Sequence, residues 1–339
     1  LMTRIGINGF GRIGRRLTRL LSERTDIEVV AINDLSDAKT LSHLLKYDSV
    51  HGVCDKEITY DSQHIVIGKE KIPLTNNVHP KETNWNKFNV DIVIECTGKF
   101  KTKEVLTHHL KNGAKKVILS SPSLNYDEIK TIVIGVNDHL LDGTETIISN
   151  ASCTTNNAAP MIAIMDKYFK IKQAYITTVH SYTTDQSLHD VPHSDLRRAR
   201  AASQSIVPTT TGAAKALTNI FPKLRSVIGG CGIRVPVING SLTDITLNID
   251  ELTSIQEINT IFKQEATKNF NNIIKYTNDP IVSVDVIGNS YSCVFDSELT
   301  SVIGNMVKIV GWYDNETGYT NRLIDLISLC VKKGCPKIL

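Results

Sequence analysis

A glycine pattern near the start of the chain narrows the possible folds more than any other feature. A strand-like run leads into a Gly-x-Gly-x-x-Gly motif, and a helical pattern over 15–24 follows; the glycines are Gly9, Gly11 and Gly14. Such glycines allow a tight turn and let the backbone approach a pyrophosphate, which the helix start then holds. Asp34 follows a second strand-like run about 20 residues later, where a ribose-binding carboxylate is expected. The alternative is an ordinary glycine turn with a capping aspartate.

The first 150 residues alternate strand-like and helical patterns. The expected strands are 4–8, 29–33, 91–96, 117–120, 131–136 and 146–149. This alternation predicts a mostly parallel sheet with helices on both faces, which is an α/β Rossmann dinucleotide-binding domain. Shorter runs between about 57 and 75 indicate an antiparallel excursion from that sheet. Because a carboxylate repels a 2′-phosphate, Asp34 favours NAD over NADP.

In the remainder of the chain, strand-like patterns are more frequent than helical ones. Expected strands are 173–182, 226–235, 240–250, 281–286, 292–295 and 306–313, with helices from 152 and near 254–269. This pattern predicts an α+β catalytic domain with a large, mostly antiparallel sheet. A final amphipathic helix over 317–332 is expected to pack on the first domain. At 339 residues the chain is long enough for two domains, which we place at 1–150 with 317–339 and at 151–316.

Cys153 stands where a β-branched, apolar run gives way to a helical pattern. The first turn of a helix has unpaired N–H groups and the positive end of the macrodipole, so a thiolate there is stabilised and the thiol pKa is expected to fall. A cysteine of this kind is a good covalent catalyst. His180 lies at the end of an apolar strand, immediately before a polar loop, and is a plausible partner for the thiol.

Two further segments carry groups that can hold an anion. Arg198, within a basic cluster, and the separate Arg234 offer bidentate donors for phosphate or carboxylate, although most arginine clusters are solvated surface. The run 209–215 places hydroxyls and a glycine at another helix start, which is a natural phosphate cradle. An ordinary capped helix without a ligand is its alternative.

Composition excludes several classes of protein. The net charge is only +3 and the basic residues form no long block, which argues against nucleic acid as the primary partner. No apolar run approaches the length of a membrane span. Seven cysteines without a Cys-x-x-Cys pair argue against a disulfide framework or a thiolate zinc site, so we expect no metal and a reducing, cytoplasmic location. The early first strand leaves no room for a signal peptide.

Six segments together resemble one family along essentially the whole chain. They are 8–14, 149–156, 195–202, 211–216, 234–236 and 312–316. In order and spacing the chain is similar to the phosphorylating, NAD-dependent glyceraldehyde-3-phosphate dehydrogenases. The resemblance implies oxidation of a small phosphorylated aldehyde with NAD and inorganic phosphate, in a cytoplasmic homotetramer. It further implies that the polar loop 182–203 lines the cofactor pocket of a neighbouring subunit.

The resemblance also assigns roles to individual residues. It implies that Cys153 is the nucleophile and His180 the base that activates it. The residues implied for binding substrate and phosphate are Ser152, Thr154, Thr183, Arg198, Thr211, Gly212 and Arg234. Those implied for the cofactor, besides the first two glycines of the motif, Gly9 and Gly11, are Arg12, Ile13, Asp34, Thr97, Ser120 and Asn315.

Two alternatives stay open at this stage. Erythrose-4-phosphate dehydrogenase shares the fold and nucleophile but handles the second phosphate differently; the segment 180–186 keeps the threonine expected of the phosphorylating enzyme. A secondary nucleic-acid-binding or protein-binding role is the other. Asn157 departs from the family pattern, since many members have a second cysteine there, and we expect activity to survive because that position is not the nucleophile.

Overall fold

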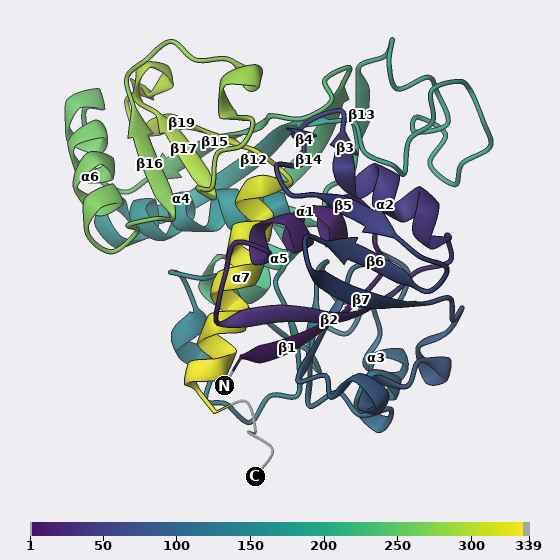
Figure 1. The fold of residues 1–339 in the computed structure, drawn as a ribbon. Helices are drawn as coiled ribbons and strands as arrows, with labels where there is room; N and C mark the ends of the chain where they lie inside the picture. Colours follow the sequence, from purple (N-terminus) through teal and green to yellow (C-terminus); the bar gives the residue numbers. More distant parts are fainter. Residues whose placement is uncertain (1, 335–339) are drawn as a thin grey trace. The chain divides into compact units, whose positions relative to one another are not determined.

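The computed structural model describes residues 2–334, which form two compact units. The first contains the chain up to Ile132, Asp138–Ala151 and the residues from Thr320 onward. The second contains Val133–Asn137 and Ser152–Tyr319. Each unit has its own sheet and its own buried core, and each is described here by itself (Figure 1).

A nine-stranded sheet forms the centre of the first unit, in the order β10-β11-β9-β8-β1-β2-β7-β6-β5. Its strands are β1 (Thr3–Asn8), β2 (Ile27–Asn33), β5 (Ile58–Tyr60), β6 (His64–Ile67), β7 (Glu70–Thr75), β8 (Ile92–Glu95), β9 (Lys116–Leu119), β10 (Lys130–Thr131) and β11 (Ile147–Ser149). Pairing is parallel from β10 to β7 and antiparallel for β6 and β5. The antiparallel excursion expected between 57 and 75 is therefore present.

The helices of this unit connect its parallel strands. They are α1 (Arg12–Leu21), α2 (Ala38–Lys46) and α3 (Lys103–Lys111), with short 3-10 helices η1 (Pro80–Glu82), η2 (Trp85–Phe88) and η3 (Asp138–Leu140). A small hairpin of β3 (Tyr47–Asp48) and β4 (Gly52–Val53) follows α2. Central strands such as β8 are buried along their whole length, as expected for a parallel sheet covered on both faces.

An eight-stranded sheet forms the second unit, in the order β13-β14-β12-β15-β19-β17-β16, with β18 paired to β19. Its strands are β12 (Ile171–Ser181), β13 (Val207–Thr209), β14 (Ile228–Val235), β15 (Ser241–Ile249), β16 (Ile274–Thr277), β17 (Cys293–Asp296), β18 (Ser301–Ile303) and β19 (Met306–Tyr313). Only β12 with β14 and β16 with β17 pair in parallel, so the sheet is mostly antiparallel.

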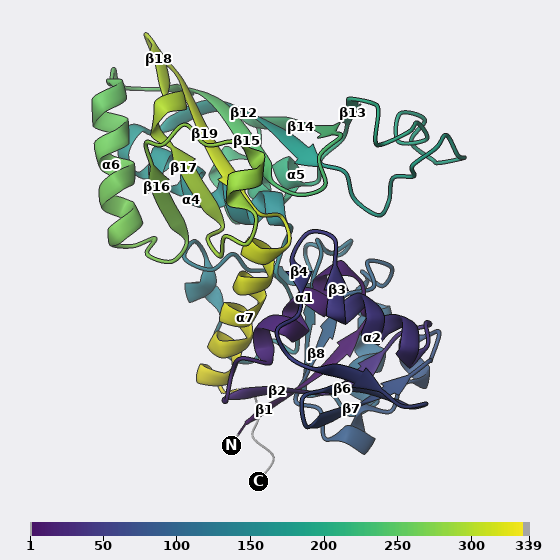
Figure 2. The same ribbon diagram turned by 45° about the horizontal axis from the view of Figure 1, so that its top comes forward.

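Helices α4 (Cys153–Phe169), α5 (Ala213–Ile220) and α6 (Ile255–Thr267) pack on this sheet, and 3-10 helices η4 (Pro222–Leu224), η5 (Ser283–Val286) and η6 (Ser297–Leu299) join its strands. Figure 2 shows α6 beside the β16 end, and the long loop between β12 and β13 extending beyond the opposite end. The last helix, α7 (Thr317–Lys332), begins in the second unit and belongs to the first from Thr320. None of the helices within residues 2–334 is long and apolar enough to cross a membrane.

Two predicted strands are wrong. The run 131–136 is a strand only as far as Thr131; after it, Gly135 at φ 82° and a hydrogen bond from the Val133 N–H to Asn137 Oδ1 (2.7 Å) close a turn. The run 281–286 is mostly the 3-10 helix η5, whose start is held by Asp285 Oδ2 accepting from the Val282 N–H (2.7 Å). In both cases local side-chain hydrogen bonds override a β-branched composition.

Candidate active site

Cys153 is the first residue of α4, as the sequence predicted. The turn that delivers it includes Ala151 in a left-handed conformation (φ 57°) and Ser152 in an extended one. The Ser152 hydroxyl caps the helix by accepting from the Thr155 N–H at 3.1 Å. The thiol therefore starts the helix, beside backbone N–H groups that have no carbonyl partner within it.

The thiol and an imidazole face each other. Cys153 Sγ lies 3.4 Å from His180 Nε2, and His180 sits near the end of β12 with only 5% of its surface exposed. On the other side of the ring, His180 Nδ1 lies 2.7 Å from the Ser181 carbonyl oxygen, which can only accept. This contact places the ring proton on Nδ1 and leaves Nε2 as an acceptor directed at the thiol.

Burial governs the protonation of this pair. Burial raises the pKa of the Cys153 thiol, although Arg234 and the hydrogen bonds from Thr154 act in the opposite direction. Burial, followed by the charge of Arg234, lowers the pKa of His180 to about 4. The expectation of a thiol with a lowered pKa is therefore wrong for the free chain, because removal from water outweighs the groups at the helix start. Burial thus disfavours the charged form of each group, and His180 Nε2 is the acceptor nearest to the thiol.

A buried tyrosine that the sequence reasoning missed joins the elements carrying this pair. The Tyr313 hydroxyl lies 2.8 Å from Thr154 Oγ1 and 3.0 Å from Thr178 Oγ1, so it links α4 to β12. Its ring meets the His180 ring edge-on, with centroids 6.0 Å apart. The residue lies within the segment 312–316 that carried the family resemblance, but nothing in its own neighbourhood distinguished it from an ordinary core aromatic.

Arg234 extends the polar site away from the thiol. Its Nη1 donates to Thr183 Oγ1 at 2.9 Å and to the Ser181 carbonyl at 3.3 Å. Thr183 in turn donates to Asp185. The structure thus brings together Cys153, His180, Thr183 and Arg234, which are far apart in the sequence, around one strand end of the second unit.

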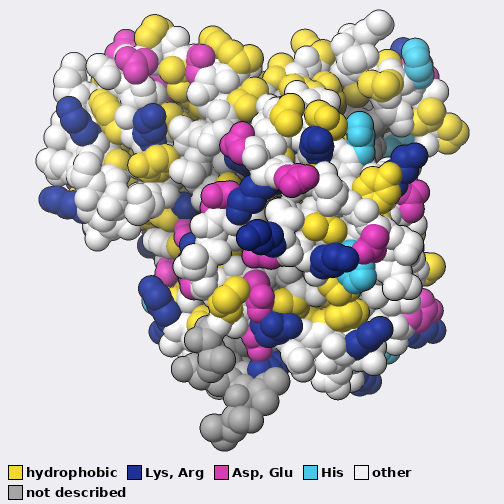
Figure 3. All heavy atoms as spheres, viewed as in Figure 1, with side chains coloured by type: hydrophobic (Ala, Val, Ile, Leu, Met, Phe, Trp, Pro, Cys, Tyr) yellow, Lys and Arg dark blue, Asp and Glu magenta, His cyan; other side chains and the backbone are white. Residues whose placement is uncertain are grey.

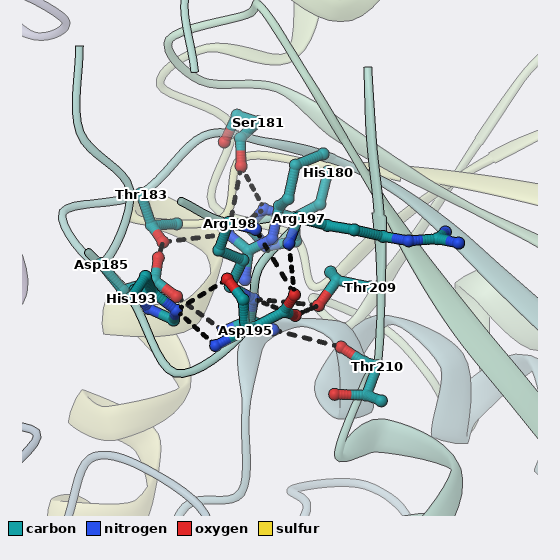
Figure 4. Close-up of polar contacts among 11 residues, drawn as sticks. His180, Ser181, Thr183, Asp185, His193, Asp195, Arg197, Arg198, Thr209 and Thr210 are labelled. Carbon is teal, nitrogen blue, oxygen red and sulfur yellow. Dashed lines mark hydrogen bonds and ion pairs between the residues drawn. The ribbon is translucent and has the colours of Figure 1, made fainter. Parts of the chain in front are cut away.

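Arg198 is held nearby in the long loop (Figure 4). It donates to Thr209 Oγ1 at 2.9 Å and to Asp185 Oδ2 at 2.7 Å, and it approaches the Thr210 carbonyl at 3.3 Å. Asp185 therefore connects Arg198 with Thr183, a link that the sequence did not predict because a loop carries no periodic signal. Both arginines have the fixed fork of donors that suits phosphate oxygens.

Thr211 and Gly212 precede α5 in the way that the sequence indicated. Thr211 Oγ1 accepts from the Ala213 N–H at 3.2 Å, and Gly212 is the N-cap without a side-chain cap. A Cβ added at Gly212 would have no atom within 4 Å, so space remains open at this helix start. An anion in that space would face the positive end of the α5 dipole.

Asn315 is oriented by two serines. Its Oδ1 accepts from Ser181 Oγ at 2.9 Å and from Ser241 Oγ at 3.0 Å, and only 8% of the surface of Asn315 is exposed. Since its carbonyl oxygen accepts both of these hydrogen bonds, the amide N–H groups are the donors of the Asn315 side chain. Asn157, at the departure from the family pattern, is buried and donates to the Ser292, Gly311 and Trp312 carbonyls.

The glycine turn in the first unit has the shape that its motif predicts. Gly9 adopts φ 92°, and a Cβ there would lie 2.7 Å from the Thr97 nitrogen; a Cβ at Gly14 would lie 2.4 Å from the Gly9 carbonyl oxygen. At Gly11 a Cβ would meet nothing within 4 Å, so the turn leaves open space at the start of α1. Asp34 Oδ2 accepts from the Phe10 N–H at 2.7 Å, which places the carboxylate beside this turn.

The other residues predicted for the cofactor lie on the same unit. Arg12 and Ile13 begin α1, and Arg12 makes two contacts with the Asp48 carboxylate, at 2.7 and 3.0 Å. Thr97 follows β8, and Ser120 follows β9 with its N–H donating to the Glu95 carbonyl at 3.0 Å. All four therefore stand at the carboxyl ends of parallel strands or at the adjoining helix start, where ligands bind in folds of this kind.

Comparison with known proteins identifies the family. Residues 3–103 match the model of the glyceraldehyde 3-phosphate dehydrogenase NAD binding domain, and residues 152–315 match that of its C-terminal domain. The chain belongs to the glyceraldehyde-3-phosphate dehydrogenase family. The chain is 45% identical to glyceraldehyde-3-phosphate dehydrogenase 1 of Bacillus cereus over 98% of this chain and 100% of that protein. Against the glyceraldehyde-3-phosphate dehydrogenases of Mycobacterium leprae and Geobacillus stearothermophilus the identities are 47% and 46%, over 98% of this chain and 99% and 100% of those proteins.

Membership of the glyceraldehyde-3-phosphate dehydrogenase family confirms several predictions. The fold is a Rossmann-type NAD-binding domain with an α+β catalytic domain, the chain is an NAD-dependent oxidoreductase, and its cofactor is NAD. Within residues 2–334 no cluster of three or more His, Cys, Asp or Glu side chains is placed to hold a metal ion. These matches do not give the roles of individual residues.

Proposed function

We propose that this chain oxidises D-glyceraldehyde 3-phosphate to 1,3-bisphosphoglycerate with NAD and inorganic phosphate, and that it works in glycolysis or gluconeogenesis. The proposal rests on the approach of Cys153 Sγ to His180 Nε2 at 3.4 Å. Arg234, whose guanidinium can bind a phosphate, contributes to the same polar site. A partly buried thiol with a base within hydrogen-bonding distance is what covalent aldehyde oxidation needs. We assign the nucleophile to Cys153 and the base to His180.

The reaction begins with transfer of the Cys153 proton to His180 Nε2, as the sulfur attacks the aldehyde carbon. His180 Nε2 passes that proton on to the carbonyl oxygen, which leaves the imidazole neutral again and a hemithioacetal on Cys153. His180 Nε2 then accepts the hydroxyl proton as the carbon is oxidised by loss of a hydride, and the product on Cys153 is a thioester. NAD, when bound, supplies the acceptor of that hydride. Inorganic phosphate attacks the thioester carbon and expels the Cys153 thiolate, which releases the acyl phosphate.

The residues of the first unit fit a dinucleotide. The open space at Gly11 is where a pyrophosphate would approach the N–H groups of α1, and Asp34 stands beside the same turn for a ribose hydroxyl. We propose Gly9, Arg12, Ile13, Thr97 and Ser120 as further cofactor contacts. We also propose Asn315, whose fixed amide can donate to a carboxamide.

Two anion subsites account for the remaining polar groups. We propose that Thr183, Arg198 and Arg234 hold the phosphate of the substrate, since Arg234 and Thr183 are already in contact. We propose that Ser152, Thr154, Thr211 and Gly212 hold the attacking phosphate at the starts of α4 and α5. An anion at a helix start is favoured by both the unpaired N–H groups and the dipole.

The test is an assay of NADH formation by the purified protein with this aldehyde, with and without inorganic phosphate. We expect sustained turnover only when phosphate is present, because the thioester otherwise stays on Cys153 or hydrolyses slowly. Erythrose 4-phosphate serves as the comparison substrate. Faster, phosphate-independent oxidation of erythrose 4-phosphate would replace the proposal by the erythrose-4-phosphate dehydrogenase reaction, which the relatives described above do not favour.

We further propose that the protein is a cytoplasmic homotetramer, in which the loop 182–203 lines the cofactor pocket of a neighbouring subunit. This loop has no helix or strand of its own, and it carries the exposed apolar side chains Leu188, Val191 and Leu196. Light scattering would give four times the chain mass of 37.5 kDa if the assembly forms. We propose the domain boundaries as predicted, with 1–150 and 317–339 binding NAD and 151–316 catalytic.

Nucleic acid is not proposed as the primary partner. On the face drawn in Figure 3, Lys and Arg side chains lie interspersed with Asp and Glu. A nucleic-acid-binding face gathers positive charge, because it must neutralise a row of phosphates. Retention of a cellular role by a Cys153→Ser variant would indicate a secondary binding function.

A further inference from the structure

Glu95 is a fully buried carboxylate at the end of β8, and the reaction chemistry does not use it. We propose that Glu95 is a positioning residue for NAD. This inference rests on the proposed function, which assigns NAD binding to the glycine turn. The two oxygens of Glu95 fix Thr97 and, through Thr97, the Gly9 turn. The carboxylate accepts hydrogen bonds from four donors, and a further partner fixes the orientation of two of them, His109 and Asn8.

Both donors to the first oxygen come from one residue. Glu95 Oε1 accepts from the Thr97 N–H at 2.8 Å and from the Thr97 hydroxyl. Because an N–H group of the backbone can only donate, this oxygen must be an acceptor. Thr97 is thereby held by two hydrogen bonds at the position where its backbone nitrogen would lie 2.7 Å from a Cβ at Gly9. The close packing couples the orientation of Thr97 to the shape of the turn.

One donor to the second oxygen is a buried histidine. His109 Nε2 lies 3.1 Å from Glu95 Oε2, and the Trp85 indole N–H donates to His109 Nδ1 at 2.9 Å. An indole nitrogen can only donate, so His109 Nδ1 must be the unprotonated nitrogen and Nε2 must carry the hydrogen. His109 therefore donates to Glu95 while remaining neutral.

The other donor to the second oxygen is Asn8, whose Nδ2 lies 2.6 Å from Glu95 Oε2. Its orientation follows from a chain of contacts that begins at a backbone group. The Asn77 N–H donates to Asn33 Oδ1 at 2.9 Å, which leaves Asn33 Nδ2 to donate to Asn8 Oδ1 at 2.8 Å. Asn8 must then present its NH₂ group to Glu95. The same Asn33 also receives, at its backbone carbonyl, the N–H of Gly9 at 2.8 Å.

All four donors therefore require two accepting oxygens at position 95. An ionised carboxylate meets this need, whereas a glutamine of the same size would turn one NH₂ group toward existing donors. The hydrogen bonds lost with glutamine would loosen the carboxyl ends of β1, β2 and β8, which carry the glycine turn and Thr97. A buried carboxylate with these four donors holds the glycine turn and Thr97 in one conformation before the dinucleotide binds.

The experiment compares Glu95→Gln with Glu104→Gln, a change of the same kind at an exposed position on α3. Calorimetry gives the dissociation constant for NAD, and steady-state kinetics give kcat at saturating NAD. We expect Glu95→Gln to raise the dissociation constant about 10-fold or more and to change kcat by less than about 3-fold, with the Glu104→Gln protein unchanged. The alkylation rate of Cys153 by iodoacetamide, measured without NAD, should be unaltered because that thiol lies in the other unit.

Two further measurements test the donor assignment, and the second of them needs no variant. Trp85→Phe removes the donor that fixes His109, so Nε2 of His109 becomes free to accept from the introduced amide, and of the two donors to the second oxygen only Asn8 still opposes that amide. In the Trp85→Phe background we therefore expect Glu95→Gln to weaken NAD binding several-fold less than it does in the natural sequence. Nitrogen NMR of the natural protein should show His109 protonated on Nε2 alone.

The possible results distinguish a failure of the proposed function from a failure of the positioning role of Glu95. If the natural protein neither binds NAD nor forms NADH, the proposed function fails before the variants are compared. If it binds NAD but Glu95→Gln binds as tightly, or loses kcat and thermal stability without a change in NAD affinity, the positioning role of Glu95 is overturned. An equal effect of Glu95→Gln in both Trp85 backgrounds would overturn the donor assignment.

Discussion

Cys153 and His180 show how burial and proximity act against each other on single residues. Burial disfavours a charge on either group, raising the pKa of the thiol and lowering that of the imidazole to about 4. Proton transfer between them makes both charges at once, 3.4 Å apart, so each offsets part of the desolvation cost of the other. Burial and proximity therefore act in opposite directions on the proton shared between the proposed nucleophile and its base.

Replacing the proposed nucleophile gives the sharpest prediction for a single residue. We expect Cys153→Ser to lower the rate of phosphate-dependent NADH formation by at least about 1000-fold, because a serine hydroxyl beside a neutral imidazole is a far weaker nucleophile toward the aldehyde. The thermal unfolding midpoint should change little, since the substitution is nearly isosteric. Cys231→Ser, at another partly buried thiol, is the control and should retain activity. Comparable activity in the Cys153→Ser protein would remove the covalent mechanism.

The arginines of the long loop differ in a way that can be measured. Arg198 is mostly buried and contacts Asp185 and Thr209, whereas the Arg200 side chain is 67% exposed and meets only the exposed Asp190 among the contacts described. A hydrogen bond to a charged group contributes about 1.5–3 kcal/mol. We therefore expect Arg198→Ala to raise KM for the phosphorylated aldehyde about 10-fold to 100-fold, and Arg200→Ala to change it less than about 2-fold. Equal effects of the two changes would contradict the subsite assignment.

At the scale of elements, two helix caps of the same chemistry separate stability from function. Ser152 caps α4 at the site, and Ser254 caps α6 by accepting from the Glu257 N–H at 3.1 Å. Changing either serine to alanine should lower the free energy of unfolding by about 1 kcal/mol. Only Ser152→Ala should also lower kcat, because its loss frees the turn that places Cys153. A Ser254→Ala protein with an equal loss of kcat would show that helix stability alone controls the rate.

The elements also show which features a sequence can predict. The bounds of β19 and α7 were predicted to the residue, because each has a clean apolar period that persists to its ends. The runs 131–136 and 281–286 were β-branched but failed as strands, since Asn137 and Asp285 satisfy the backbone locally. Composition cannot distinguish a strand from a turn that side chains close.

Local sequence patterns likewise reveal only some residues of the candidate site. Cys153 and His180 lie at element boundaries, where a change of period marks them, and the structure brings them together. Tyr313 and Asp185 were missed, because one resembles a core aromatic and the other lies in a loop without a period. Their contacts depend on which strands and loops become neighbours in space, and that information is not local in the sequence.

At the scale of the whole molecule, the buried imidazole makes stability depend on pH. The pKa of His180 is about 4 in the folded chain and about 6.5 when unfolded, so between these values the unfolded chain binds a proton that the folded chain does not. The free energy of unfolding should therefore fall as the pH falls from about 6.5 to 4. The difference of pKa limits this contribution to about 3 kcal/mol.

The variant His180→Asn isolates that contribution. An asparagine cannot titrate, so its curve of unfolding free energy against pH should lack this part of the slope, while carboxylates common to both proteins affect the two curves alike. Urea titrations at several pH values between 4 and 7 measure both curves. The advantage of the natural protein over the variant should shrink by about 2–3 kcal/mol from pH 7 to pH 4, on top of a pH-independent offset from changed packing. Parallel curves would mean that His180 titrates alike in the folded and unfolded chain, and would contradict a lowered pKa of His180 in the folded protein.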